Sequence, residues 1–268
     1  MTYTFLKPKT TNIWQATWDE VKNKWYFWMS FLLFFIFGFF ALIIPFLIII
    51  FVQNKFRKNF WKEFAEVNNW EYQDISPENF FDFSFKGNID NEESLLMFKE
   101  GHSRIISNKI SGKIKDRDFK IFCYQFTIGA GKNSRTYHFT VFSFKYYGKF
   151  PHIYLNKKGN TWNINGGNQI PLPQEFENKF SLYAPRKYEI EALEIFTIEV
   201  LLKLLQKEFC YDVELINQEI FIFTDGQINN FENLEIKFNS ALELNDLFSA
   251  KLDRFKFEQI GNLPFNLE

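Results

Sequence analysis

The feature that most constrains this chain is a long uncharged run near its N-terminus. Residues 25–54 contain no charged side chain, and residues 27–52 are almost wholly Phe, Leu, Ile and Ala. As one helix, residues 27–52 would be about 39 Å long at ~1.5 Å per residue, which exceeds the ~30 Å hydrocarbon core of a bilayer. The run therefore predicts one tilted transmembrane helix over residues 25–54, in which Gly38 or Pro45 marks a kink. A re-entrant hairpin is the alternative.

Basic side chains are distributed unevenly around this run. Flanks rich in Lys and Arg tend to stay on the cytoplasmic side of a membrane. The imbalance predicts a single-pass protein of the cell membrane whose C-terminal domain is cytoplasmic. Within about 15 residues of the run, two basic residues precede it, Lys22 and Lys24. Four follow it: Lys55, Arg57, Lys58 and Lys62.

Tryptophans recur at helical spacing around the start of the run. Spacings of four, three, four and three residues place five large side chains on one face of a helix. Because Trp prefers the interface between lipid and water, the pattern predicts a short amphipathic helix over residues 12–24 at the membrane surface. A continuous extension of the transmembrane helix into water is the alternative. The five side chains are Trp14, Trp18, Val21, Trp25 and Trp28.

The predicted organisation is an N-terminal tail (1–24), a transmembrane helix (25–54) and one soluble α+β domain (55–268). In this domain, an antiparallel sheet is expected to pack with two or three helices. Residues 104–147 are expected to form an antiparallel meander, because they are rich in Ile, Phe, Tyr, Thr and Val. The other expected elements are a helix at 56–67, a hairpin loop at 129–133, an edge strand at 152–155, a strand at 180–183, a helix at 188–209 divided at Thr197, a hairpin of strands 211–216 and 219–224, and a helix at 230–257.

Charge and cysteine content narrow the classes of function. The chain has 31 basic and 32 acidic side chains, a balance that argues against binding nucleic acid through its phosphates. Its two cysteines, Cys123 and Cys210, are far apart in sequence, and neither belongs to a CxxC or Cys/His cluster. We expect two buried free thiols in a reducing compartment, with a disulfide between them as the alternative.

No motif in the chain predicts an active site. Gly131 and Lys132 resemble part of a phosphate-binding loop, but Phe126 and Asn133 occupy the positions where that loop needs Gly and Ser or Thr. The three histidines are not spaced with one another or with carboxylates for metal binding. The sequence therefore assigns no catalytic, cofactor-binding or metal-binding residue, and it predicts no cofactor.

Three segments carry a resemblance to a known group of proteins. They are residues 64–72 (FAEVNNWEY), 180–185 (FSLYAP) and 188–193 (YEIEAL), which follow the uncharged run in this order. With them, the chain resembles an uncharacterised bacterial family of membrane-anchored proteins, a domain of unknown function, over about residues 55–255. The resemblance implies a bacterial inner membrane, a single N-terminal transmembrane helix and a cytoplasmic α+β domain, and it implies no activity.

Together, these observations favour a non-enzymatic binding or scaffold module held at a membrane. Its expected partners are the lipid bilayer and another membrane-associated protein, and no nucleic acid is expected. The alternative is an enzyme or transport accessory that acts on a membrane-linked substrate through a site that no linear motif reveals. Because loops often carry function, the predicted interaction surface comprises Lys132, Arg135 and Trp162, with Trp14, Trp18, Trp25 and Trp28 at the membrane interface.

Overall fold

The computed structural model of the chain describes residues 3–37, 43–74, 95–159, 167–206 and 212–259. Within them the fold is α+β, as the sequence predicts. The strands are β1 (Glu71–Gln73), β2 (His102–Ile114), β3 (Arg117–Ile128), β4 (Arg135–Lys157), β5 (Gln169–Ile170), β6 (Phe180–Tyr183) and β7 (Asp212–Asp225). The helices are α1 (Ile13–Lys22), α2 (Trp25–Phe37), α3 (Ile43–Val67), α4 (Leu96–Lys99), α5 (Gln174–Glu177), α6 (Glu189–Ile195), α7 (Ile198–Leu204) and α8 (Phe231–Gln259), with 3-10 turns η3 (Gly131–Asn133) and η4 (Arg186–Tyr188).

The described strands form one antiparallel sheet, which is larger than the predicted meander. Its order is β1-β2-β3-β4-β6-β5, and β7 pairs with β4 outside this path. The meander predicted for residues 104–147 is confirmed, because β2 pairs with β3 and β3 pairs with β4. The loop predicted at residues 129–133 joins β3 to β4 and contains the turn η3. The sheet thus supplies a wide platform for the helices.

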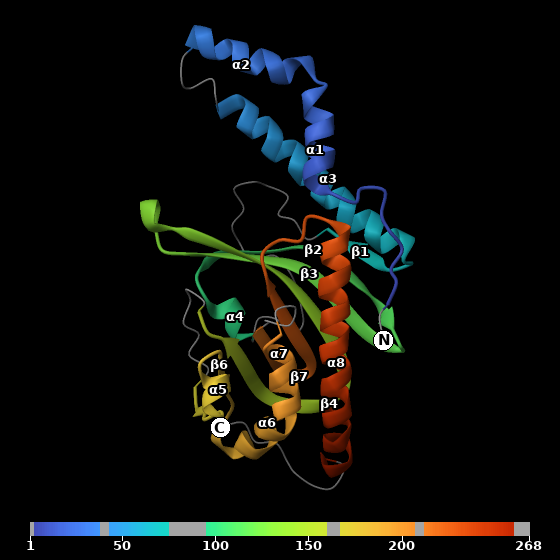
Figure 1. The fold of residues 1–268 in the computed structure, drawn as a ribbon, viewed down its shortest axis with the longest axis vertical. Coiled ribbons are helices and arrows are strands. Elements are labelled where there is room, and N and C mark those ends of the chain that lie inside the picture. Colours follow the sequence, from blue (N-terminus) through green and yellow to red (C-terminus); the bar gives the residue numbers. More distant parts are fainter. Residues whose placement is uncertain (1–2, 38–42, 75–94, 160–166, 207–211, 260–268) are drawn as a thin grey trace.

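The main apolar core lies between one face of the sheet and the helices α3, α6, α7 and α8 (Figure 1). Phe238 of α8 is completely buried there. Its ring stacks on Phe5, with centroids 4.7 Å apart, and on Phe142 of β4 at 5.4 Å. The predicted division at Thr197 is confirmed, since Thr197 occupies the N-cap position of α7. The helix predicted for residues 230–257 is confirmed as α8.

A smaller apolar cluster covers part of the opposite face of the sheet. It includes Phe122, Tyr124 and Phe126 of β3, whose side chains alternate with those that face the main core. The short helix α4 lies against them, with the ring of Phe98 4.2 Å from that of Tyr124. Both faces of β3 are therefore buried along much of its length, which accounts for its run of apolar residues.

The N-terminal segment is built into the domain rather than hanging from it as a tail. The backbone N–H of Tyr3 donates to Asn239 Oδ1 at 2.7 Å, and that of Ile13 donates to the carbonyl of Asn229 at 2.9 Å. Phe5 is buried and contacts Phe64 of α3 as well as Phe238 of α8. Residues before and after the uncharged run therefore pack side by side on the same body.

The predicted single transmembrane helix over residues 25–54 is wrong. Two helices occupy the run: α2 has 13 residues, and α3 has 25 but continues into the charged residues 55–67. Among the described residues, none of the helices combines the length and the apolar character that crossing a bilayer requires. Pro45 lies in the first turn of α3, where its missing N–H costs no hydrogen bond, so it favours a new helix beginning there. The predicted single-pass location with a cytoplasmic domain is corrected accordingly.

Two smaller expectations in the sheet are also wrong. Residues 211–216 and 219–224 were expected to form a hairpin, but 212–225 are one strand, β7, which pairs with β4 on both sides of Asn217. Asn217 adopts φ 54° opposite Phe150, where the register with β4 shifts. The extra residues at both shifts lie on β4, so Asn217 bends a continuous strand instead of forming a turn between two strands. Residues 152–155 are likewise part of β4 and pair with both β6 and β7, so they are not an edge strand.

Gly112 of β2 allows the ring of Trp70 to approach the sheet closely. A Cβ atom at Gly112 would be 2.5 Å from Trp70 Cδ1 and 3.0 Å from Phe119 Cε1. We expect Gly112→Ala to lower the free energy of unfolding by about 1–3 kcal/mol, because packed rings must move to admit the methyl group. Urea unfolding of the single variant, of Trp70→Leu and of the double variant measures this cost. A Gly112→Ala cost that is unchanged in the Trp70→Leu background would contradict the steric explanation.

Candidate functional site

Helices α2 and α3 form an antiparallel pair that projects from the end of the sheet domain (Figure 1). We call α2 together with residues 43–55 of α3 the apolar hairpin. Its base is held by α1, whose first turn is capped by the side chain of Asn12, an acceptor for the N–H of Gln15 at 3.1 Å. Val21 of α1, Phe27 of α2 and Val52 of α3 are buried together. The hairpin therefore has a small core of its own at the end nearest the domain.

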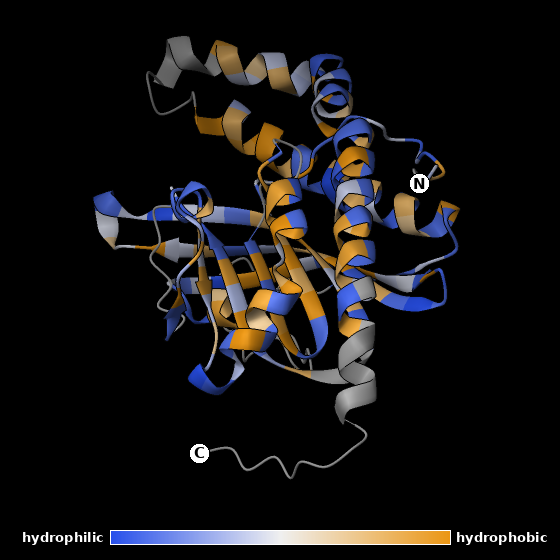
Figure 2. Cartoon of the chain, turned by 60° about the horizontal axis from the view of Figure 1, so that its bottom comes forward, coloured by the Kyte–Doolittle hydropathy of each residue, from blue (hydrophilic) through white to orange (hydrophobic). Residues whose placement is uncertain are grey.

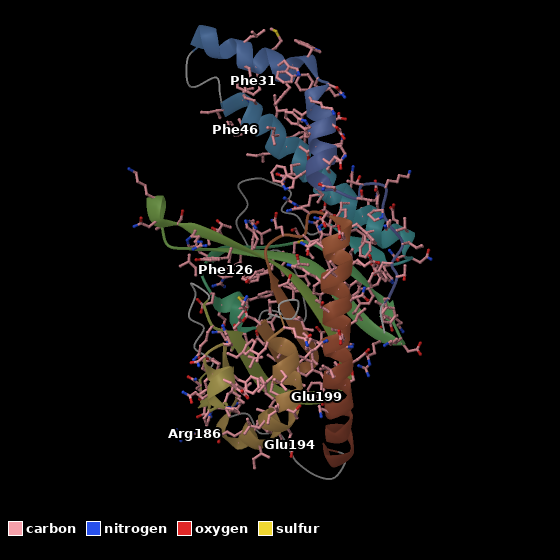
Figure 3. The ribbon with its side chains drawn as sticks, viewed as in Figure 1. Phe31, Phe46, Phe126, Arg186, Glu194 and Glu199 are labelled. Atoms are coloured by element: carbon pink, nitrogen blue, oxygen red, sulfur yellow. The ribbon has the colours of Figure 1, made fainter. Side chains whose placement is uncertain are left out.

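Beyond this base, the hairpin exposes large apolar side chains on both helices. Trp25 is 73% exposed, Phe46 66% and Phe51 74%. Phe31 of α2 and Phe46 of α3 are labelled in Figure 3. Figure 2 shows that hydrophobic residues occur along both helices. Globular monomers rarely expose contiguous apolar patches of this kind without a binding role. The other exposed apolar residues of the hairpin are Tyr26, Trp28, Met29, Leu32, Ile43, Ile44, Leu47 and Ile50.

Charged side chains surround the base of the hairpin and are missing from residues 25–54. Lys22 forms an ion pair with Asp19 at 2.5 Å, and Lys24 forms one with Glu20 at 3.3 Å. On α3, Lys55 is the first charged residue after the apolar part. The site thus changes from apolar to charged over about one helical turn, which is the polarity profile of a bilayer surface.

A groove runs along one side of α3, with a cavity volume of about 400 Å³. Its apolar lining comes mostly from α3, through side chains spaced by three or four residues. Glu20 of α1 and Lys55 of α3 supply its charged lining residues. The remaining lining residues are Tyr26, Ile44, Leu47, Ile48, Phe51 and Val52.

The predicted membrane-interface tryptophans gather around the hairpin. Trp14 and Trp18 are half-exposed on α1, and Trp25 and Trp28 are exposed on α2. The indole N–H of Trp28 donates to the carbonyl of Lys22 at 2.7 Å, which satisfies a polar group at the start of α2. The amphipathic helix predicted for residues 12–24 is confirmed as a helix by α1. Its position at a lipid surface stays a prediction.

The predicted interaction surface lies elsewhere in the fold. Lys132 is exposed in the turn η3, and the guanidinium of Arg135 lies 5.1 Å from the ring centre of Tyr137 at the start of β4. Trp162 lies outside the described residues. The structure therefore places Lys132 in the loop between β3 and β4 and Arg135 at the first position of β4, and their role in binding stays a prediction.

A polar hollow of about 510 Å³ lies on the sheet, and its buried carboxylate, that of Glu219, is already paired. Glu219 of β7 is buried, accepts from Lys120 Nζ at 3.0 Å and accepts from Ser143 Oγ at 3.0 Å. These contacts satisfy the carboxylate without a ligand. Across the residues that the structure describes, no group of three His, Cys, Asp or Glu side chains could hold a metal ion.

Glu214 of β7 is a second buried carboxylate and acts as a structural clamp. Its Oε1 lies 2.5 Å from His152 Nε2 and accepts the backbone N–H of Leu96 at 2.7 Å. Because Leu96 opens α4, this contact ties α4 to the second face of the sheet. The arrangement therefore positions a helix.

Cys123 is a buried free thiol, as predicted, and Cys210 lies outside the described residues. Burial raises the pKa of Cys123 to about 12, although Arg57 acts in the opposite direction. Since the thiolate is the reactive form, we expect Cys123 to be inert at pH 8 in the folded protein. In a Cys210→Ser variant, iodoacetamide should modify Cys123 at least ~100-fold more slowly without urea than in it. Equal rates in the two conditions would contradict the burial of this thiol.

Comparisons with known proteins assign neither a family nor a function to this chain. No family model and no curated protein matches the chain, so the resemblance described above stays a prediction. Among solved structures, the chain is similar to the crystal structure of the mycobacterial trehalose monomycolate transport factor A. The two share 12% identity over 71% of this chain and 92% of that chain, with a TM-score of 0.46. A likeness at this level carries no argument about function.

Sequence reasoning missed the residues that form the groove. Ile44, Leu47, Ile48, Phe51 and Lys55 follow a regular helical stripe, which was present in the sequence. The stripe was hidden because the neighbouring positions are apolar as well. Gly38 and Pro45 were the local signals in the sequence that the uncharged run is interrupted.

Proposed function

We propose that the chain is a non-enzymatic binding module that attaches to a lipid bilayer by laying the apolar hairpin into one leaflet. The single observation that carries this proposal is the outward-facing apolar surface of α2 and α3, which includes Trp25, Phe46 and Phe51. In this arrangement the hairpin enters and leaves the leaflet on the same side. This agrees with the contact between Phe5 and Phe64, which flank the uncharged run in sequence.

The sequence of side chains along the hairpin supports lipid as the partner. Phe46 lies near the start of α3, at the end of the hairpin away from its base. Trp18 and Lys22 lie on α1, which holds the base. Aromatic and basic residues at the base suit the headgroup region, and Phe and Ile side chains suit the acyl region. A protein partner would more often meet an apolar patch with a polar rim and hydrogen-bonding groups.

The energetics favour insertion by several independent side chains. Transfer of one Phe or Ile side chain from water to an apolar environment contributes about 1.5–3 kcal/mol. Phe46 and Phe51 are more exposed than most apolar side chains of the chain, so they gain most from the transfer. By contrast, the buried carboxylates Glu214 and Glu219 are each engaged by neighbouring protein groups. Burial of the exposed apolar side chains is therefore the contribution that favours a lipid partner.

Vesicle flotation of the full chain tests this proposal. The purified protein is mixed with vesicles of neutral phosphatidylcholine and centrifuged through a density gradient. We expect the protein to float with the vesicles, and lipids brominated in the upper part of the acyl chain to quench its tryptophan fluorescence. A protein that stays at the bottom, and whose mass by light scattering is that of a dimer, would contradict the proposal, because a second copy would then cover the hairpin.

A further inference from the structure

We infer that the groove along α3 holds one acyl chain of an anionic phospholipid, with the headgroup at Lys55. This inference rests on the proposed attachment of the hairpin to lipid and names the lipid that the hairpin selects. It concerns a defined site for one molecule, which general insertion into a leaflet does not require.

The shape and lining of the groove suit an acyl chain. Ile44 and Lys55 lie at its two ends along α3, about 16 Å apart at ~1.5 Å per residue. Between them the lining from α3 is formed by aliphatic and aromatic side chains, and α2 contributes Tyr26. An elongated apolar groove with charge at one end matches a molecule with a long apolar chain and a charged head.

The charges at the groove select an anionic head. Glu20 is already paired with Lys24 at 3.3 Å. Lys55 has no hydrogen-bonding or ion-pair partner among the described residues, unlike Lys58 and Lys62 further along α3, which pair with Asp74 and Glu66. An unpaired ammonium group beside a neutralised carboxylate leaves this end of the groove positive. We therefore expect the phosphate of an anionic phospholipid to bind better there than that of a zwitterionic lipid, whose headgroup also carries a positive charge.

The position of the groove identifies membrane lipid as the source of this chain. The residues that line it, such as Leu47 and Phe51, are themselves exposed apolar residues of the hairpin. The groove is thus continuous with the surface that enters the leaflet. Lys55 lies where α3 changes from apolar to charged, which is the level of the headgroups. A lipid of the same leaflet can enter the groove sideways without leaving the bilayer.

Retention of phosphatidylglycerol measures occupancy of the groove. The full chain is bound to phosphatidylcholine vesicles that contain a minority of phosphatidylglycerol, extracted in mild detergent and examined by native mass spectrometry. Ile44→Trp fills the groove, whereas Ile43→Trp makes the same change at an exposed neighbour that does not line it. Lys55→Gln removes the charge at the groove, and Lys62→Gln removes a charge that is paired with Glu66.

We expect one phosphatidylglycerol per chain in the unmodified protein and in the two control variants. Lys55→Gln should lower this retention about fivefold, since one basic residue near anionic lipid changes binding by about that factor. Ile44→Trp should lower it about fivefold or more, because the indole ring occupies the space of the acyl chain. The unmodified protein and all four variants should float to a similar extent with vesicles of phosphatidylcholine alone. Flotation without retained phosphatidylglycerol, or equal retention in Ile44→Trp and Ile43→Trp, overturns the groove inference and leaves the proposed function standing. Absence of flotation overturns both.

Discussion

Replacing Phe46 and Phe51 together by glutamate is expected to abolish binding of the chain to phosphatidylcholine vesicles. Both side chains are more than half exposed on α3, so the change costs the fold little. On the bilayer, the variant loses about 3 kcal/mol or more of transfer free energy, because two Phe side chains no longer leave water. This corresponds to a dissociation constant at least ~100-fold higher. Cosedimentation over a series of lipid concentrations measures it.

A matched control separates this effect from a general effect of added charge. Ile190 and Ile198, on α6 and α7, are 72% and 60% exposed, close to Phe46 at 66% and Phe51 at 74%. The double variant Ile190→Glu, Ile198→Glu should bind vesicles as the unmodified chain does. If both double variants lose binding to the same extent, net charge and not the hairpin governs attachment.

Replacing Phe238 by alanine is expected to lower the free energy of unfolding by about 3–5 kcal/mol. This ring is completely buried and joins several parts of the chain. It contacts Phe5 of the N-terminal segment, Trp70 before β1, Phe119 of β3 and Phe142 of β4. Removing it leaves a cavity between elements that cannot close over it independently. Urea unfolding followed by circular dichroism measures the loss.

The control for this prediction lies two residues earlier on the same helix. Ile236 is half-exposed on α8, so Ile236→Ala should change the free energy of unfolding by less than about 1 kcal/mol. A cost below that same value for Phe238→Ala would mean that α8 does not form the centre of the main core.

Much of the sheet domain could be predicted from the sequence because its signals are local. The strands β2 and β3 are rich in β-branched and aromatic residues, and Thr197 divides α6 from α7 at a residue suited to begin a helix. The predicted turn at Asn217 is wrong for a physical reason. Asn tolerates a positive φ both in turns and in bent strands, and only the pairing with β4 decides between them.

The path of the uncharged run could not be predicted, because long-range contacts decide it. One long helix and two shorter helices satisfy the same local pattern of apolar residues. The deciding observation is the contact of Phe5 with Phe238, which lies at the other end of the chain. The same holds for the candidate site. The tryptophans could be predicted from their spacing, whereas the groove with Lys55 could not, because it depends on the position of α3 beside α1 and α2.

The built-in N-terminal segment affects how the molecule would sit on a surface. Phe5 holds the chain to α8 before the hairpin begins, and Phe60 and Phe64 hold it to the main core after the hairpin ends. Two attachment points restrict rotation far more than one flexible tether does. With the hairpin in a leaflet as proposed, the sheet domain would therefore not rotate freely beneath it. Any partner that approaches from solution would meet the same side of the domain on every copy, so attachment would also set orientation.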